Sequence, residues 1–571
     1  MRVVWRVQAV LTLMFCLVTA PAGETELPVG EEESSRLVER TSTQPSVPAS
    51  ESSQWIAVVA PGLREAIEPL AAFRAKQGHP VVIIDVPAEE SNPDAAAALL
   101  RRVRETCEAF RGTSCVLLVG APLLNDDVSA DCIVPALKGN VGRMQSRYTD
   151  NPNGCIEDDG AARVAVGRFP ARTPAEARGM VRKTIAWERE PPPGLWKRRM
   201  VLLAGAPSYN EIIDRMVEKL ALGYFDRLPP DYRANVIYFN PNSSFTLPSG
   251  HLLAQAKAYL DEGQLLTVYI GHSLASGFWQ EDGWGDLFTS GDWSAVKLPA
   301  ARGLFVSGGC FGVCFDTPGY GSYGVAAMRN PEGPVAVIGS EWLDYAAMAM
   351  LLSEGLLEGL ANGDEPVKLG QLWLSMRQHV LEAPIDPLTY RMLDAIEGDP
   401  DTPPEAQRHE HLEMFHLLGD PALSLPRLGY RLDVICPHSI DAGQTIEVTC
   451  NIPRELRGAQ GRVSVERRLT SVPTDVVPVS EDLDEAAREN TMLENHRRAN
   501  RFELCGADVR GQDAGVCARL KLPDQLGWSE LVVRVWLSNG KTEGQGVCVI
   551  RVRTENMTGQ GAGNRHDATP P

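Results

Sequence analysis

Two residues able to do nucleophilic chemistry follow two successive apolar runs of this chain. The run LLTVYI is followed by Gly271 and His272, and the run GLFVS by two glycines and Cys310. A free thiol is only slightly ionised at neutral pH, and a nearby imidazolium lowers its pKa so that thiolate is present for attack. His272 and Cys310 are therefore a candidate base and nucleophile. Their types alone leave two other interpretations open, a buried polar residue and half of a disulfide.

The two residues can meet only if their runs are neighbouring strands of one sheet. Short β-branched runs that alternate with helical segments recur from Trp55 to Pro426 and predict parallel sheets covered on both faces. Open parallel sheets bind and react beyond the carboxyl ends of their strands, where both residues lie. The glycines beside them, Gly271 and Gly309 among them, permit tight turns whose backbone N–H groups can receive an oxyanion.

The chain divides into three folded parts. A proline cluster at 191–193 separates two doubly wound α/β subdomains, which we place at 54–193 and 194–426. Beyond them, period-two strands and the hairpin signal Asn539-Gly540 predict an all-β sandwich of immunoglobulin-like size at 427–553. The acidic stretch 480–501 is expected to be a long loop or insertion within it.

The first residues predict export. Arg2 and Arg6 precede an apolar core that ends in small residues, so we expect a signal peptide at 1–22, cleaved after Ala22. A flexible leader at 23–53 and a disordered tail at 554–571 follow from their polar composition. No later segment approaches the roughly 18 apolar residues of a spanning helix. The mature protein is expected to be a secreted or cell-envelope monomer without a transmembrane segment.

The net charge and the cysteine count limit the kinds of partner and the disulfides that we expect. A net charge of −19 over 571 residues argues against nucleic acid or an anionic membrane, since either requires a basic face. Cleavage removes one of the 12 cysteines and leaves an odd number, so at least one thiol is unpaired within the chain. Two disulfides and one leftover thiol are expected among the sandwich cysteines, which are Cys436, Cys450, Cys505, Cys517 and Cys548.

Several blocks of the sequence, in this order, resemble the gingipain family of cysteine peptidases, within the caspase-like group. Before the His272 run stand WIAVVAPGLREAIEPLAAFRAKQGHPVVIIDV, CVLLVGAP and YTDNPNGCIEDDGAARVAVGRFPARTPAEA. CFGVCFD, GPVAVIGS and FHLLGDPALSLP come from Cys310 onward. The resemblance covers Trp55 to Pro426. It implies a caspase-like fold, an endopeptidase acting on proteins or peptides, and an immunoglobulin-like module after the catalytic domain.

The resemblance also implies residue roles. His272 would be the general base and Cys310 the nucleophile that forms a thioester acyl-enzyme, with Gly271 and Gly309 shaping the turns. Cys310 is preferred to Cys314 because the family pattern Cys-x-x-x-x-Phe-Asp fits only when it is counted from Cys310. No cofactor would be required.

Two departures from the family pattern keep an alternative open. Ser273 stands where the family has glycine, so its backbone N–H would serve an oxyanion only if its dihedral angles suit, and its β-carbon would crowd the oxyanion site. The acid that orients the histidine in the family falls on Pro207, Ser208 and Tyr209, so that role is not transferred. Cys314 adds a thiol that could trap Cys310 as a disulfide. A catalytically inactive relative, acting as an extracellular binding or assembly protein, is therefore the alternative.

Other candidate sites have an ordinary interpretation of equal or greater weight. An oxygen-rich loop would hold a structural calcium ion, as in related enzymes, or be a solvated turn. Trp279 and Trp284 would line a substrate pocket, as that loop does in the family, or belong to core or rim. HEHLEMFH lacks the zinc-peptidase spacing and reads as a helix surface. The calcium candidates are Asp150, Asn151, Glu157, Asp158 and Asp159.

Overall fold

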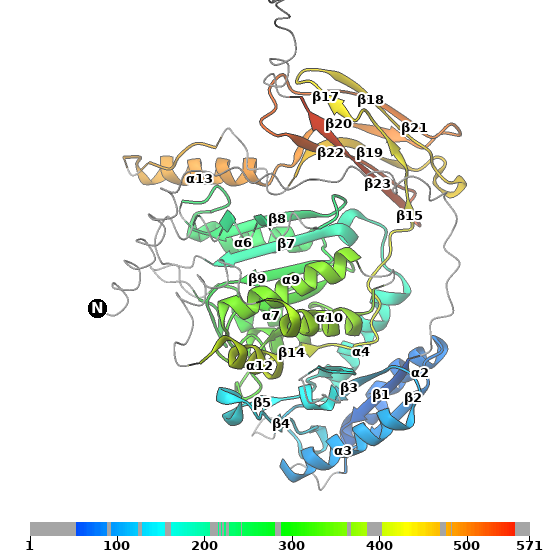
Figure 1. Cartoon of the computed structure of the whole chain (residues 1–571), viewed down its shortest axis with the longest axis vertical. Helices are drawn as coiled ribbons and strands as arrows, with labels where there is room; N and C mark the ends of the chain where they lie inside the picture. Colours follow the sequence, from blue (N-terminus) through cyan, green and yellow to red (C-terminus); the bar gives the residue numbers. More distant parts are fainter. Residues whose placement is uncertain are drawn as a thin grey trace, which may run out of the picture.

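An α/β body with a strand-rich region at one end makes up the computed structural model of the chain (Figure 1). The expected signal peptide, most of the leader and the tail lie outside the residues that it describes. The structure describes residues 53–87, 93–123, 128–154, 161–205, 215, 218–219, 222–223, 228–240, 242–279, 287–362, 367–384, 402–468, 476–480 and 482–553.

One sheet of ten strands forms the centre of the α/β body, in the order β2-β1-β3-β6-β14-β13-β12-β9-β7-β8. Most of its strands are apolar runs buried on both faces, as expected of parallel strands covered by helices, whereas the edge strand β2 is only partly buried. Their bounds are β1 Gln54–Val59, β2 Val81–Asp85, β3 Ser114–Val119, β6 Ala165–Phe169, β7 Arg199–Gly205, β8 Arg233–Phe239, β9 Leu266–Ile270, β12 Leu304–Gly308, β13 Ala336–Ser340 and β14 Phe415–Leu418.

The two predicted α/β subdomains thus share a single sheet, which corrects the expectation of two separate ones. β14 pairs antiparallel with β13 of the second half and parallel with β6 of the first. The strands of the two halves therefore run in opposite directions, and β14 closes the gap between them. β14 has only four residues, and its sequence does not indicate which strands it will pair with.

Helices cover the second half of the sheet on both faces. Side chains alternate across β12, so that Leu304 and Val306 pack with α9 and α10 while Phe305 faces α7 and α8. Phe305 stacks on Trp293 of α7 with ring centroids 4.6 Å apart. The helix bounds are α2 Arg64–Lys76, α3 Pro93–Ala109, α4 Pro174–Arg189, α6 Ser249–Asp261, α7 Ser290–Ala295, α8 Tyr323–Arg329, α9 Ala346–Asn362, α10 Leu369–Glu382, α12 Pro404–Met414 and α13 Glu485–Ala499.

Two further sheets enclose a third core in the region predicted as a sandwich. One has the order β15-β23-β22-β19-β20, with β17 beside β23, and the other the order β16-β18-β21. The immunoglobulin likeness itself stays a prediction. The bounds are β15 Tyr430–Arg431, β16 Val434–Ile435, β17 Ser439–Ile440, β18 Thr445–Cys450, β19 Gln460–Arg467, β20 Glu503–Arg510, β21 Val516–Lys521, β22 Glu530–Ser538 and β23 Glu543–Val552, with the short pair β4 Leu137–Lys138 and β5 Tyr148–Thr149 in the α/β body.

Two expectations for this region need correction. The stretch 480–501, predicted as a long loop or insertion, is an insertion between the paired strands β19 and β20, but it forms the helix α13, whose N-cap Asp484 accepts a hydrogen bond from the backbone N–H of Ala487 at 2.8 Å. Among the described cysteines, the sandwich contains one disulfide, Cys436–Cys548, instead of two. In the register of β18 and β21, Cys517 lies opposite Thr449, one position away from Cys450. A one-residue offset puts the two thiols on opposite faces, so they cannot bond.

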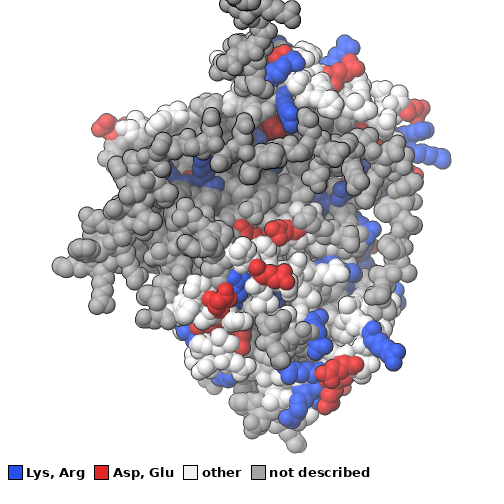
Figure 2. All heavy atoms as spheres, viewed as in Figure 1, with Lys and Arg blue, Asp and Glu red and all other residues white. Residues whose placement is uncertain are grey.

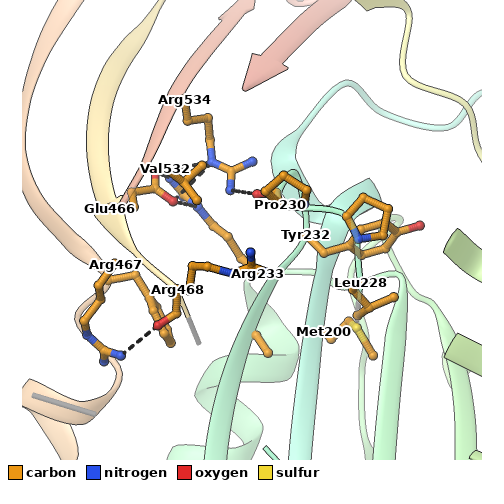
Figure 3. A pocket seen from close by; sticks show the side chains of 13 residues that line it. Met200, Leu228, Pro230, Tyr232, Arg233, Glu466, Arg467, Arg468, Val532 and Arg534 are labelled. Atoms are coloured by element: carbon orange, nitrogen blue, oxygen red, sulfur yellow. Dashed lines mark hydrogen bonds and ion pairs between the residues drawn. The ribbon is translucent and has the colours of Figure 1, made fainter. Parts of the chain in front are cut away.

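Buried ion pairs join the sandwich to the α/β body (Figure 3). Glu466 of β19 lies between Arg534 of β22 and Arg233 of β8, and the guanidinium of Arg534 also donates to the carbonyl of Asp231 at 2.7 Å. Burial alone would raise the pKa of Glu466, but the two guanidinium groups outweigh it and lower the pKa to about 2. A small hollow opens beside this cluster, lined by the cluster and by apolar side chains such as Phe502.

On the face drawn in Figure 2, Lys and Arg side chains are interspersed with Asp and Glu over the part that is described. No helix among the described residues is long and apolar enough to cross a membrane.

Candidate active site

The strands that precede His272 and Cys310 are neighbours. β9 and β12 pair in parallel, with Leu266 opposite Leu304 and Ile270 opposite Gly308. Each candidate residue follows its strand by two positions, so both lie beyond the carboxyl edge of the same part of the sheet. The adjacency on which the sequence argument rests is confirmed.

A sharp turn after β9 presents His272. Gly271 has φ of +151°, and a β-carbon there would lie 2.9 Å from the backbone of Gly205 on β7. The carbonyl of His272 accepts hydrogen bonds from the Trp279 N–H, at 3.0 Å, and from the Tyr269 hydroxyl. The rings of Trp279 and His272 also meet edge to face, with centroids 6.1 Å apart. The backbone of the histidine is therefore held, and Trp279 packs against one side of its ring.

A second strained turn carries Cys310. Phe311, the next residue, has φ of +59°, which a residue with a β-carbon adopts only when its surroundings impose it. The Phe311 N–H donates to the Trp342 carbonyl at 3.1 Å. Gly309 is required because a β-carbon would lie within 2.7 Å of the Gly271 carbonyl oxygen. The two turns are thus packed against each other through their glycines.

The environment of the sulfur opposes ionisation in the resting protein. Burial raises the pKa of the Cys310 thiol to about 12, and the carboxylate of Asp344 adds to this effect. The backbone N–H of Asp344 acts in the opposite sense, because it donates to the sulfur at 3.4 Å. Burial also raises the pKa of the Asp344 carboxyl to about 7, and its Oδ2 atom has no hydrogen-bond partner among the described residues.

A comparison with protein families shows which family the chain belongs to. The model of peptidase family C25 matches residues 49–426, which include both turns. The chain belongs to family C25, the gingipain family of cysteine peptidases. No relative matches among curated proteins.

Three solved structures are similar to the chain at low identity. The chain is similar to the Arg-specific cysteine proteinase gingipain R (RGPB), with 18% identity, a TM-score of 0.49, and coverage of 89% of this chain and 99% of that one. It is similar to a complex of Porphyromonas gingivalis RgpB pro- and mature domains, with 17% identity, a TM-score of 0.49, and coverage of 88% and 100%. A third structure, of a protease, has 15% identity, a TM-score of 0.51, and coverage of 88% and 97%.

Ser273, where the sequence departs from the gingipain pattern, turns its side chain inward. Its hydroxyl is buried and donates to the carbonyl of Cys310 at 2.7 Å, and it also contacts the Tyr323 hydroxyl at 3.1 Å. The β-carbon thus extends towards the Cys310 backbone, and the hydroxyl links the histidine turn to the cysteine turn. Tyr323, which lies at the start of α8, was not singled out by the sequence.

Cys314, four residues after Cys310, lies in a charged cluster. Cys314 is buried, its thiol donates to Asp316 at 3.0 Å, and it is free like Cys310 rather than joined to it. The guanidinium of Arg147 lies 3.3 Å from this sulfur, 3.0 Å from Asp316 and 3.3 Å from Glu341. These three side chains have the spacing of metal ligands, but the arginine supplies the positive charge at their centre.

The described half of the predicted calcium loop has protein partners. Both carboxylate oxygens of Asp150 accept from Arg168 at 2.6 Å, and the Asn151 amide donates to the carbonyls of Glu413 and Phe415. Glu157, Asp158 and Asp159 lie outside the described residues, so a calcium ion there stays a prediction.

Of the other residues that the sequence singled out, some are described by the structure and some are not. Trp279 contacts His272, whereas Trp284 lies outside the described residues, as do Pro207, Glu211 and Asp214, where an orienting acid was sought. Two of the three histidines of HEHLEMFH, His411 and His416, are buried, and the metal-type cluster found among the described residues includes none of the three. Burial lowers the pKa of His411 to about 3 and of His416 to about 4, which keeps both neutral.

Proposed function

We propose that this family member is an exported cysteine endopeptidase whose nucleophile is Cys310 and whose general base is His272. The observation that carries the proposal is the register of β9 against β12, which brings both residues to one edge of the sheet. The hydrogen bond from Ser273 to the Cys310 carbonyl supports it, because it joins the two turns. Export rests on the sequence of residues 1–22.

In this mechanism His272 takes the thiol proton as the sulfur attacks the carbonyl carbon of the scissile peptide bond. A carbon–sulfur bond forms, the carbon–nitrogen bond breaks, and the imidazolium returns the proton to the leaving amine. Water then adds to the thioester, which releases the carboxylic acid and restores the thiol. The high pKa of the resting thiol makes proton transfer to His272 part of the attack, since little free thiolate is present beforehand.

The test is hydrolysis of a quenched-fluorescent peptide library by the mature chain under reducing conditions. The proposal expects internal cleavage by the wild type and a loss of at least about a thousandfold in rate for Cys310→Ala, the scale on which catalytic residues act. His272→Ala should lose a similar factor. One arm contains calcium and the other a chelator, because the sequence predicts a loop that would hold a structural calcium ion.

An inactive binding relative is the second candidate, and two observations favour it. No hydrogen bond joins the His272 ring to the Cys310 sulfur among the described residues, and burial raises the thiol's pKa. Absence of cleavage in every arm, with a folded protein, would favour this candidate.

A further inference from the structure

Three buried hydroxyls form a continuous chain beneath the two turns. Ser307 on β12 lies 2.6 Å from the Tyr323 hydroxyl, which lies 3.1 Å from Ser273, which donates to the carbonyl of Cys310 at 2.7 Å. All three side chains are at most 5% exposed. This row of hydroxyls connects the strand that precedes Cys310, the helix α8 and the turn that carries His272.

Counting the hydroxyl protons shows which group donates in each of these hydrogen bonds. The Ser273 hydroxyl has one proton, and it is used on the Cys310 carbonyl, so Tyr323 must donate to Ser273. Tyr323 also has one proton, so Ser307 must donate to Tyr323. Burial raises the pKa of Tyr323, which keeps its proton in place. Aligned hydroxyls of this kind polarise one another and strengthen the last bond.

The hydrogen bond from Ser273 holds the peptide group that follows Cys310 and so helps to fix the position of the sulfur. The carbonyl of Cys310 accepts from Ser273, and the N–H on the other side of the same peptide belongs to Phe311, the residue with a positive φ. Because the Phe311 N–H is bonded to Trp342, both ends of this peptide plane are fixed. Gly309 leaves room for the Ser273 hydroxyl, since a β-carbon there would collide with that oxygen.

We infer that Ser273 is a positioning residue, which couples His272 to Cys310 by holding the Cys310 carbonyl with its hydroxyl, itself held by Tyr323. The inference rests on the proposed roles of His272 and Cys310 in peptide hydrolysis. Ser273 does not touch the reacting atoms. It keeps the sulfur-bearing turn at a fixed distance from the histidine turn, and Tyr323 and Ser307 keep Ser273 in its rotamer.

The experiment is a double-mutant cycle read by iodoacetamide labelling of Cys310, with mass-spectrometric mapping across a range of pH. In the wild-type background His272→Ala should slow the labelling near neutral pH by about tenfold, the effect of roughly one pKa unit. In Ser273→Ala the same histidine change should have less than half of that effect on a logarithmic scale. Tyr323→Phe, which removes one oxygen, should reduce it in the same direction.

Ser353→Ala is the matched control, because Ser353 on α9 also donates its hydroxyl to a backbone carbonyl, that of Ala349 at 2.9 Å, away from the two turns. The control should preserve the full histidine effect. If peptides are cleaved, Ser273→Ala should also lower kcat by about tenfold while KM stays within about twofold, as expected when alignment rather than binding is lost.

An equal histidine effect in the wild type, Ser273→Ala and the control would overturn the inference, and so would the absence of any histidine effect on labelling in the wild type. Failure of the proposed function is a different result. In that case no peptide is cleaved, yet the labelling cycle still reports whether Ser273 couples the two turns.

Discussion

At the scale of single residues, Asp344 adds to the cost that burial places on a thiolate at Cys310. Its backbone N–H contacts the sulfur, while its buried carboxyl lies close enough to raise the thiol's pKa when it is charged. The pKa of this carboxyl is about 7, so it is mostly neutral below that pH and mostly charged above it. The suppression of the thiolate by Asp344 should therefore appear only as the pH rises through this value.

Asp344→Asn removes the charge and keeps the size. We expect Cys310 in this variant to react with iodoacetamide about tenfold faster than in the wild type at pH about 8.5, if the lost charge is equivalent to roughly one pKa unit. At pH about 5.5 the two proteins should react at similar rates, because Asp344 is then neutral in the wild type. Asp441→Asn, which removes an exposed carboxylate of the sandwich, is the control. Equal acceleration at both pH values would contradict the account.

The sequence located His272, Cys310 and both glycines because strand ends and small residues are local signals. It missed Asp344, although the same rule applies: the residue comes shortly after β13, the strand next to β12. It missed Tyr323 because nothing local indicates that the first residue of a helix will reach two serines on separate strands. Ser273 was identified as a departure, but the direction of its side chain depends on that tertiary contact.

At the scale of elements, α13 fixes the edge of the large sheet. Asn500, its C-cap, receives a hydrogen bond from the Val236 N–H at 2.7 Å and donates to the Val236 carbonyl at 3.0 Å, so its amide pairs with the edge strand β8. One turn earlier, His496 contacts the Phe245 carbonyl at 2.9 Å and the Tyr259 hydroxyl at 2.8 Å. Burial lowers the pKa of His496 to about 4, so this contact is made by the neutral ring.

Acid should therefore weaken the docking of α13. The folded pKa of His496 lies below its ordinary value of 6.5, so its contribution to stability is complete above 6.5 and is lost as the pH falls towards 4. In urea titrations from pH about 7.5 to 4.5, His496→Asn should show a smaller loss of unfolding free energy than the wild type, by about 1–3 kcal/mol. His411 and His416 titrate in the same sense in both proteins and cancel. Parallel stability curves would contradict this role.

The helix itself was within reach of the sequence. Asp484 and Glu485 at its start and His496, Arg497 and Arg498 in its last turn are the charges that favour helix ends. Its acidic and polar composition suggested a loop instead, because only a few of its side chains are buried and the apolar periodicity is weak. Its packing against β8 joins segments more than 200 positions apart, which no local pattern indicates.

At the scale of the whole molecule, a single sheet and a buried charge cluster join the three predicted parts. The sequence predicted the strands of both halves, but the position of β14 between β6 and β13 is a long-range choice made by packing. Glu466 and its two arginines likewise come from strands of different parts (Figure 3). The second half, which carries His272 and Cys310, is thus braced on one side by the first half and on the other by the sandwich.

Removing Glu466 should test this bracing. Glu466→Gln leaves Arg534 buried without its counter-charge, and breaking a buried pair in this way costs about 3–5 kcal/mol. We expect a loss of that order in unfolding free energy by urea titration at neutral pH. Glu494→Gln, which removes an exposed carboxylate paired with Arg497 and Arg498, should leave the stability nearly unchanged. Similar small losses for both variants would show that the cluster does not hold the parts together.

The central claim is that Cys310 and His272 act as one unit, and the most direct measurement is affinity labelling. The folded chain is incubated with a mixture of peptidyl chloromethyl ketones, and every free cysteine is quantified by peptide mapping. The account predicts that the adduct forms on Cys310 far faster than on the other free thiols and that His272→Ala abolishes this preference. Equal labelling of the accessible thiols, or a preference for Cys310 that persists without His272, would contradict it.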